Sequence, residues 1–352
     1  MKKIVNVLSI QLENPKIRIG EMRIGIAYGD ERIAQVLNRL ILNHSDHEVV
    51  WIACSSTQVF EKAIDEKPDL ILLDLNIPST GGVEATRRMM KQAPCALLLL
   101  VQSVNWRSAE IFEAMGYGAL DVLAMQTSIG EIEKEALLKK IETIGLLIGH
   151  HYNRKKSGIN IHGKKASRLP HLVLIGASTG GPLALAKLLA DFPQHSSLAI
   201  VAIQHVDEKF AAGFANWLDR QISLEVKIAD QGTQPEEGFV LVAGTNHHLI
   251  MNQKLELVYA PNPLDSPYRP SVDVLFNSVA EHWPNRGVAV LLTGMGSDGA
   301  KGLKRLHDLG WHTIAQREES CVVYGMPKAA VDLAAVRETL QLEKIADSIK
   351  SY

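Results

Sequence analysis

The sequence places a serine, a histidine and an aspartate directly after three separate apolar stretches. Ser178 follows HLVLIGA, His205 follows SLAIVAIQ, and Asp298 follows GVAVLLTGMGS. These residue types can carry out acyl transfer, because a histidine can take the proton of a serine hydroxyl while a carboxylate orients the imidazole. We therefore expect a serine-hydrolase site built from residues that lie far apart along the chain.

Each of these signals also has a structural interpretation. Ser178 lies in GASTGGP, and glycine-rich turns before a helix can cradle phosphates. A histidine at a strand end is more often a packed or surface residue, and an aspartate in GSDG is commonly a turn former or helix cap. The turn lacks both the G-x-x-x-x-G-K-[ST] pattern and the separated glycines of a dinucleotide fingerprint. A nucleophilic Ser178 is therefore favoured over a nucleotide-binding loop.

The three residues can meet only if the chain forms a parallel sheet. Strand-like and helix-like stretches alternate from Arg23 to about residue 148, and the alternation resumes near Leu169. Repeated β-α units predict doubly wound α/β domains, and functional groups gather beyond the carboxyl ends of such strands. Asn252 and Gln253, between HLIM and KLELVY, indicate an antiparallel hairpin added to the second sheet.

The length of 352 residues predicts two domains. The stretch HHYNRKKSGINIHGKKASRLP loses apolar periodicity and gains basic and small residues, which is typical of a linker. The expected organisation is an N-terminal extension at residues 1–21, a first domain at 22–148, a linker at 149–168 and a second domain at 169–352.

Composition excludes several classes of protein. The net charge of −2 argues against a nucleic-acid binder, and the strongest apolar run, ALLLLV, is too short to cross a bilayer. MKKIVNVLSI lacks the features of a secretory signal, and three cysteines without paired spacing fit a reduced cytoplasm.

The adjacent pairs His150-His151 and His247-His248 are poor chelators, because neighbours on a strand point to opposite faces. We expect a cytoplasmic protein without a metal site.

Most of residues 171–332 resemble the chemotaxis protein-glutamate methylesterases, the CheB-type response regulators. The shared stretches, in the order of the family, are IGASTGGP, IQHV, GFANWLD, YRPSVDVLF, LLTGMGSDGAKGL and SCVVYGMPKAA. The resemblance implies that Ser178 is the nucleophile, His205 the general base and Asp298 the carboxylate that orients it. It also implies a Rossmann-like catalytic domain.

The same resemblance implies supporting roles for Thr179, beside the histidine, and for Met295, through its backbone near the oxyanion. The implied substrate is a glutamyl methyl ester on the cytoplasmic helices of a chemoreceptor, and deamidation of receptor glutamine is the same acyl transfer with ammonia leaving. Neither step needs a metal or an organic cofactor. The alternative is a non-catalytic scaffold that binds the receptor or signalling partners such as a chemotaxis histidine kinase. The intact serine, histidine and aspartate favour the enzyme.

Residues 22–148 resemble a response-regulator receiver, most clearly in PDLILLDLNIPSTGGVEATRRM and GYGALDVLAM. The resemblance puts Asp74 at the phosphoacceptor position. Phosphoryl transfer to a carboxylate needs Mg²⁺, which receivers hold with an acidic pair after the first strand. Tyr28 and Gly29 stand at those positions in this sequence.

Two further receiver positions are altered. Met125 replaces the family's lysine after the fifth strand, and Gln102 replaces the serine or threonine after the fourth. We therefore expect a degenerate receiver, in which Asp74 remains but most of the phosphorylation chemistry is absent.

Overall fold

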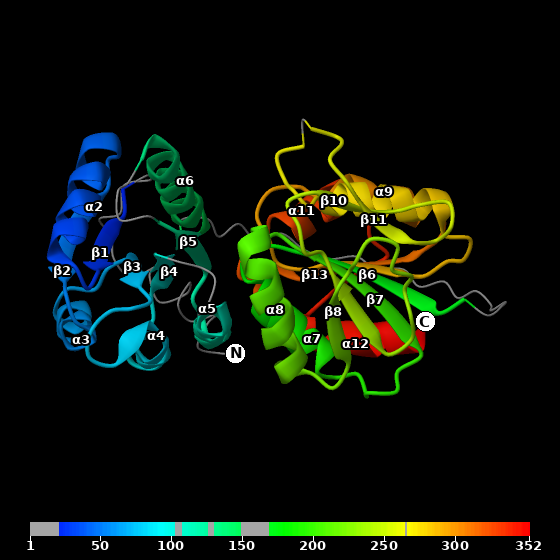
Figure 1. Ribbon diagram of the computed structural model, residues 1–352, viewed down its shortest axis with the longest axis horizontal. Helices are drawn as coiled ribbons and strands as arrows, with labels where there is room; N and C mark the ends of the chain where they lie inside the picture. Colours follow the sequence, from blue (N-terminus) through cyan, green and yellow to red (C-terminus); the bar gives the residue numbers. More distant parts are fainter. Residues whose placement is uncertain (1–20, 103–107, 126–129, 149–168, 265) are drawn as a thin grey trace. The chain divides into compact units, whose positions relative to one another are not determined.

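The computed structural model describes the chain in five stretches, residues 21–102, 108–125, 130–148, 169–264 and 266–352 (Figure 1). The chain divides into two compact units, residues 1–154 and 155–352. The expected linker, and the expected N-terminal extension apart from Glu21, lie outside the described residues.

The first unit contains a five-stranded parallel sheet with the order β2-β1-β3-β4-β5. Helices α2 and α6 cover one face, and α3, α4 and α5 cover the other (Figure 1). The elements are β1 (Arg23–Ala27), α2 (Glu31–His44), β2 (Glu48–Ala53), α3 (Ser56–Asp65), β3 (Leu70–Asp74), α4 (Gly81–Gln92), β4 (Ala96–Val101), α5 (Ser108–Tyr117), β5 (Asp121–Ala124) and α6 (Glu131–Ile148).

Local sequence explains why these elements form. Strands β3 and β4 are continuous apolar runs, and both are completely buried between the two helical layers. Helix α2 begins after Asp30, whose side chain accepts a hydrogen bond from Arg32 N. Its buried residues recur at helical spacing, so one face packs on the sheet. The strands therefore end together at one edge, where Asp74 is the last residue of β3.

The second unit contains a seven-stranded parallel sheet with the order β14-β13-β12-β6-β7-β9-β8, and a separate antiparallel pair, β10-β11. The strands are β6 (His171–Ala177), β7 (Leu198–Gln204), β8 (Glu225–Ile228), β9 (Phe239–Val242), β10 (His248–Met251), β11 (Leu257–Ala260), β12 (Val288–Leu291), β13 (His312–Gln316) and β14 (Glu338–Leu340). The helices are α7 (Gly181–Leu189), α8 (Glu208–Gln221), α9 (Val272–His282), α10 (Ala300–Asp308), α11 (Met326–Asp332) and α12 (Leu342–Ser351). The predicted α/β class with two doubly wound sheets is confirmed.

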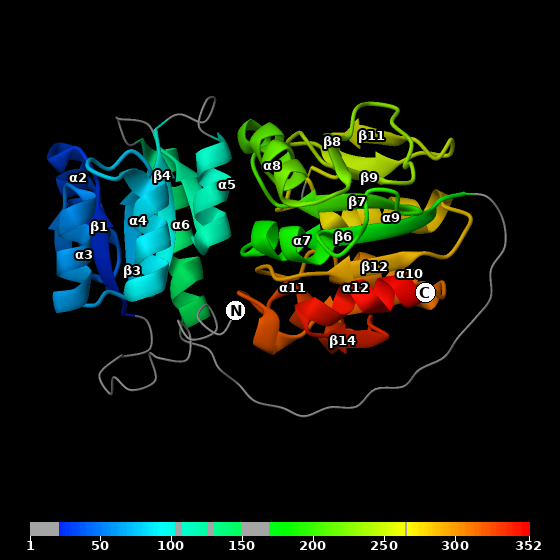
Figure 2. The ribbon, with the colours of Figure 1, turned by 90° about the horizontal axis from the view of Figure 1, so that it is seen from below.

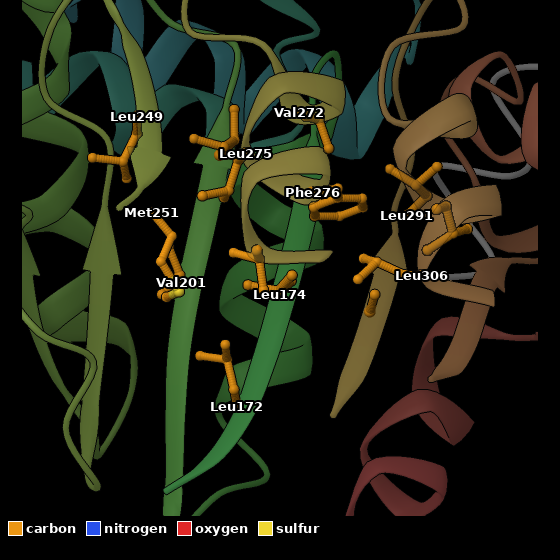
Figure 3. Packing of buried hydrophobic residues seen from close by; sticks show 14 of the residues in the cluster. Leu172, Leu174, Val201, Leu249, Met251, Val272, Leu275, Phe276, Leu291 and Leu306 are labelled. Atoms are coloured by element: carbon orange, nitrogen blue, oxygen red, sulfur yellow. The ribbon is translucent and has the colours of Figure 1, made fainter. Parts of the chain in front are cut away.

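The core of the second unit lies between the sheet and α9. Phe276 and Leu275 of α9 pack with Leu174 of β6 (Figure 3). The predicted hairpin is present as a separate two-stranded sheet. Leu249 and Met251 of β10 pack into this same core. The hairpin thus covers the face of the large sheet and does not extend its edge.

Strands β12, β6 and β7 lie side by side at the centre of the large sheet (Figure 2). The chain runs outward from β6 through β7 to β8 and β9, and then returns to β12 on the other side of β6. The carboxyl ends of β6 and β12 therefore form a topological switch point, which is where doubly wound sheets bind ligands. Among the described helices, none combines the length and apolar character needed to cross a membrane.

Candidate active site

Ser178 is the first residue after β6, in a tight turn that leads into α7. Its N–H donates to Thr293 O at 3.1 Å, and Gly181 N donates to Ser178 O at 2.7 Å. Gly180, with φ of +76°, makes the left-handed step before α7, and Pro182 lies in the first helical turn. The serine therefore sits close to the positive end of α7, which favours negative charge there.

The loop after β12 approaches this serine very closely. A Cβ atom at Gly294 would lie 2.8 Å from Ser178 Cβ and 2.3 Å from Met326 Sδ. Gly294 also donates its N–H to Val323 O and accepts a hydrogen bond from Met326 N. Only glycine leaves room for this approach, which brings the loop carrying Asp298 next to the nucleophile turn.

His205 is the first residue after β7, and its N–H donates to Ala177 O at 3.0 Å. Its Nε2 lies 2.8 Å from Asp298 Oδ2. Its Nδ1 is buried and has no hydrogen-bond partner among the described residues. No hydrogen bond joins Ser178 Oγ to the ring among those residues, and such contacts commonly tighten only when substrate binds. Nδ1 is thus the ring nitrogen left to accept a proton.

The Asp298 carboxylate is held at the N-terminus of α9. Oδ1 accepts hydrogen bonds from Ser271 Oγ at 2.7 Å and Asp273 N at 3.1 Å, and Oδ2 accepts from Val272 N at 2.7 Å as well as from His205. Burial by itself raises the pKa of Asp298, but the hydrogen bond and charge of His205 and the donors of α9 outweigh burial and lower that pKa. The carboxylate therefore stays ionised beside the imidazole.

His248 supports this arrangement from β10. Its Nδ1 accepts a hydrogen bond from Ser271 N at 3.2 Å, while its Nε2 lies 3.0 Å from Pro263 O. Because a carbonyl only accepts, Nε2 carries the proton and the fully buried ring is neutral. No pattern in the sequence indicated this role for His248. Its neighbour His247 is exposed, the pair at 150–151 lies outside the described residues, and the described part of the chain contains no cluster of three metal-binding side chains.

Gln204, the last residue of β7, links the backbones of Ser178 and His205. Its Nε2 donates to Ser178 O at 2.9 Å and to His205 O at 3.2 Å. Thr293 plays a similar part, because its hydroxyl accepts from Val323 N at 2.8 Å and lies 3.0 Å from Thr179 O. A polar residue that ends a buried apolar strand is the signal that could have identified Gln204.

The structure brings Thr179 and Met295 to the same strand-end edge, on the loops that follow β6 and β12. Within the described stretches, the backbone N–H groups of both residues donate to no acceptor, and no hydrogen bond links Thr179 to His205. Two such N–H groups are the donors that a developing oxyanion needs. Their roles remain predictions.

In the first unit, Asp74 ends β3 and is 3% exposed. Its Oδ2 accepts a hydrogen bond from Gly29 N at 3.2 Å and its Oδ1 accepts from Asn76 N at 2.8 Å. Burial raises the pKa of Asp74, and these two hydrogen bonds only partly oppose the effect. Both carboxylate oxygens therefore already accept backbone hydrogen bonds, and the side chain is almost completely buried.

The groups around Asp74 do not fit a magnesium site. Tyr28 is 2% exposed, and its hydroxyl accepts a hydrogen bond from Gln102 Nε2 at 3.0 Å. Met125 is buried as well. Asp30, the acidic residue that directly follows Tyr28 and Gly29, caps α2 and forms an ion pair with Arg32. Mg²⁺ needs several oxygen ligands in near-octahedral geometry, which this set does not supply.

Two family models match the chain. A model described as CheB methylesterase matches residues 173–349, and a response regulator receiver domain model matches residues 27–137. The second match shows that the first unit has receiver character despite its altered residues.

Similar proteins match over nearly the full length. A Pseudomonas aeruginosa protein named protein-glutamate methylesterase/protein-glutamine glutaminase 3 is 44% identical over 92% of this chain and 98% of its own length. A Cupriavidus metallidurans protein of the same name, numbered 2, is 44% identical over 92% of this chain and 96% of its own. The crystal structure of the Thermotoga maritima CheB methylesterase catalytic domain is 33% identical, covers 52% of this chain and 99% of that structure, and has a TM-score of 0.50.

Proposed function

The chain belongs to the CheB methylesterase family, and from this premise we propose that it hydrolyses glutamyl methyl esters on the cytoplasmic helices of chemoreceptors with Ser178 as the nucleophile. The observation that carries the proposal is the pairing of His205 Nε2 with the buried Asp298 carboxylate, while Nδ1 of the same ring has no hydrogen-bond partner in the described part of the chain. A substrate on the cytoplasmic helices of a receptor calls for an enzyme that acts in the cytoplasm.

The geometry supports the following reaction. Nδ1 of His205 takes the proton of Ser178 Oγ as the oxygen attacks the ester carbonyl carbon. The negative charge of Asp298 stabilises the imidazolium that forms, and the free N–H groups of Thr179 and Met295 receive the oxyanion. When the tetrahedral intermediate collapses, the imidazolium returns its proton to the leaving methoxide and methanol departs. The glutamyl group remains bound to the serine.

Water then completes the cycle. His205 removes a proton from water, which attacks the glutamyl-enzyme ester; the imidazolium then returns the proton to Ser178 Oγ, and the receptor leaves with a free glutamate side chain. Deamidation of glutamine follows the same two steps with ammonia as the leaving group, and the names of the relatives include this glutaminase activity. No step calls for a metal or an organic cofactor.

Regulation is expected to depart from phosphorylation. The Tyr28–Gln102 contact and the buried Asp74 leave no acidic pair for Mg²⁺. We therefore propose that the first unit is a degenerate receiver, controlled by a signalling partner that binds its conformations with different affinity. A chemotaxis histidine kinase is one candidate for that partner.

The direct test is methanol release from a methylated receptor fragment by the full-length protein. Wild type should release methanol, and Ser178→Ala should fold normally and release almost none. Ser297→Ala, an exposed serine on the loop after β12, serves as the matched control and should retain activity. A wild-type protein that binds the receptor without releasing methanol or ammonia would instead support the scaffold.

A further inference from the structure

Tyr268 lies flat against the ring of His205. The two ring centroids are 4.6 Å apart and the planes are inclined by only 6°. Tyr268 belongs to the segment before α9, so it comes from none of the strands that end at Ser178, His205 and Asp298. The side chain is half-buried, and its position beside the base has no role in the reaction described above.

The loop that carries Asp298 leaves room for this tyrosine. A Cβ atom at Gly296 would lie 2.2 Å from the Tyr268 hydroxyl, so the glycine leaves space for the end of this side chain. The hydroxyl makes no hydrogen bond within the described parts of the chain. The aromatic ring, and not its hydroxyl, is therefore the part of Tyr268 that the site is built to hold.

Two contacts together fix the orientation of His205. Asp298 binds one edge of the imidazole at Nε2, and Tyr268 covers one of its faces. A rotation of the imidazole would break the first contact and collide with the second. Both contacts keep Nδ1 in a single direction, which matters because small misplacements of a catalytic group reduce rate strongly.

We propose that Tyr268 is a positioning residue for His205, which holds the ring for proton transfer from Ser178 and stabilises its charged form during acylation. The face of an aromatic ring carries negative potential and attracts a cation within about 6 Å of its centroid. The imidazolium that forms during attack would lie within that distance. This inference rests on the proposed function.

The test uses the full-length protein and a fluorophosphonate probe, which phosphonylates an activated serine whatever the natural substrate. We compare Tyr268→Phe, which keeps the ring, with Tyr268→Leu, which removes it. Tyr259→Leu on β11 is the matched control, because Tyr259 is also half-buried in the second unit, but its hydroxyl accepts a hydrogen bond from Gly244 N and its ring makes no stacking contact with His205 among the described residues. The maximal labelling rate at saturating probe is measured separately from the probe concentration that gives half that rate.

We expect Tyr268→Phe to label within about twofold of wild type. Tyr268→Leu should lower the maximal rate about tenfold and leave the half-saturating concentration unchanged, while Tyr259→Leu stays near wild type. Equal labelling by Tyr268→Leu and wild type would overturn the inference and leave the proposed function standing. Equal losses of the maximal labelling rate in Tyr268→Leu and Tyr259→Leu would show that Tyr268 contributes only general packing and would overturn the inference. Wild-type labelling that survives Ser178→Ala would overturn both the inference and the proposed nucleophile.

Discussion

The Ser271 hydroxyl donates a 2.7 Å hydrogen bond to Oδ1 of Asp298, the carboxylate that binds His205. The same hydroxyl accepts a 3.4 Å hydrogen bond from Val274 N and so caps α9. One side chain therefore begins a helix and orients the carboxylate of the candidate site. Because His248 in turn accepts the Ser271 N–H, a chain of buried contacts runs from the hairpin to the base.

Ser271→Ala should affect both stability and turnover. Loss of an N-cap costs about 1 kcal/mol of unfolding free energy, and loss of a donor to a buried carboxylate adds to that cost. We expect kcat for ester hydrolysis to fall about tenfold, because Asp298 then holds His205 less firmly. Urea unfolding and methanol release measure the two effects.

Ser55→Ala provides the matched control for the cap. Ser55 caps α3 of the first unit, with the same 3.4 Å contact to Gln58 N, and belongs to the unit that does not carry the candidate site. It should destabilise its own unit and leave kcat unchanged. If Ser271→Ala lowers stability without lowering kcat, the link between the cap and the base is wrong.

The sequence predicted that Ser178, His205 and Asp298 lie at one edge of a sheet because each of them follows an apolar stretch that forms a buried strand. It did not reveal β13 or β14, since HTIAQ is half polar and ETL is a short, partly exposed edge strand. Gln204 was missed although it is a polar residue at the end of a buried apolar strand. Tyr268 and His248 escaped for a different reason. Their contacts are made by chain segments that meet only after folding, and local patterns carry no record of such contacts.

Gln204→Met should separate activity from stability. The substitution removes the two hydrogen bonds to Ser178 O and His205 O. It also removes Gln204 Oε1, a buried oxygen without a partner among the described residues, and that gain offsets much of the loss. We expect little change in unfolding free energy and about a tenfold fall in turnover, because the nucleophile and the base are no longer tied together.

The control for this variant is Gln234→Met. Gln234 Nε2 also donates to a backbone carbonyl, that of Lys254, but this contact joins the β8–β9 loop to the β10–β11 turn and involves neither Ser178 nor His205. Turnover of this control should stay at the wild-type value. A drop in stability for Gln204→Met that accounts for its whole loss of turnover would contradict the tethering role.

Burial of Asp74 predicts that the free energy of unfolding of the first unit decreases as the pH rises. Because its pKa is raised above the ordinary 3.8, the unfolded chain ionises first, so stability falls as the pH rises from 3.8 to the folded pKa, and this loss is absent below 3.8. Asp74→Asn removes this titration. The unfolding free energy of the variant minus that of wild type should therefore be more favourable at pH 7 than at pH 3. Calorimetry at both pH values measures it, and an unchanged difference would show that Asp74 titrates normally.

Asp74 should also fail as a phosphoacceptor. Its two oxygens already accept backbone hydrogen bonds, Tyr28 and Gly29 supply no carboxylate for Mg²⁺, and Met125 supplies no positive charge for a phosphoryl group. Incubation with Mg²⁺ and acetyl phosphate should leave the intact mass unchanged and should not raise esterase activity.

If the altered residues prevent phosphorylation of Asp74, restoring the receiver residue types should allow it. The triple variant Tyr28→Asp, Gly29→Asp, Met125→Lys restores the residue types that a receiver uses to hold Mg²⁺ and the phosphoryl group, so it should gain an adduct that Asp74→Asn abolishes. Gly29 tolerates a side chain only if Pro78 moves, since a Cβ there would lie 2.9 Å from Pro78 Cδ, and the gain should therefore be partial. An Asp74-dependent adduct on the unaltered protein, together with Mg²⁺-dependent activation, would instead mean that the first unit is an ordinary phosphorylation switch.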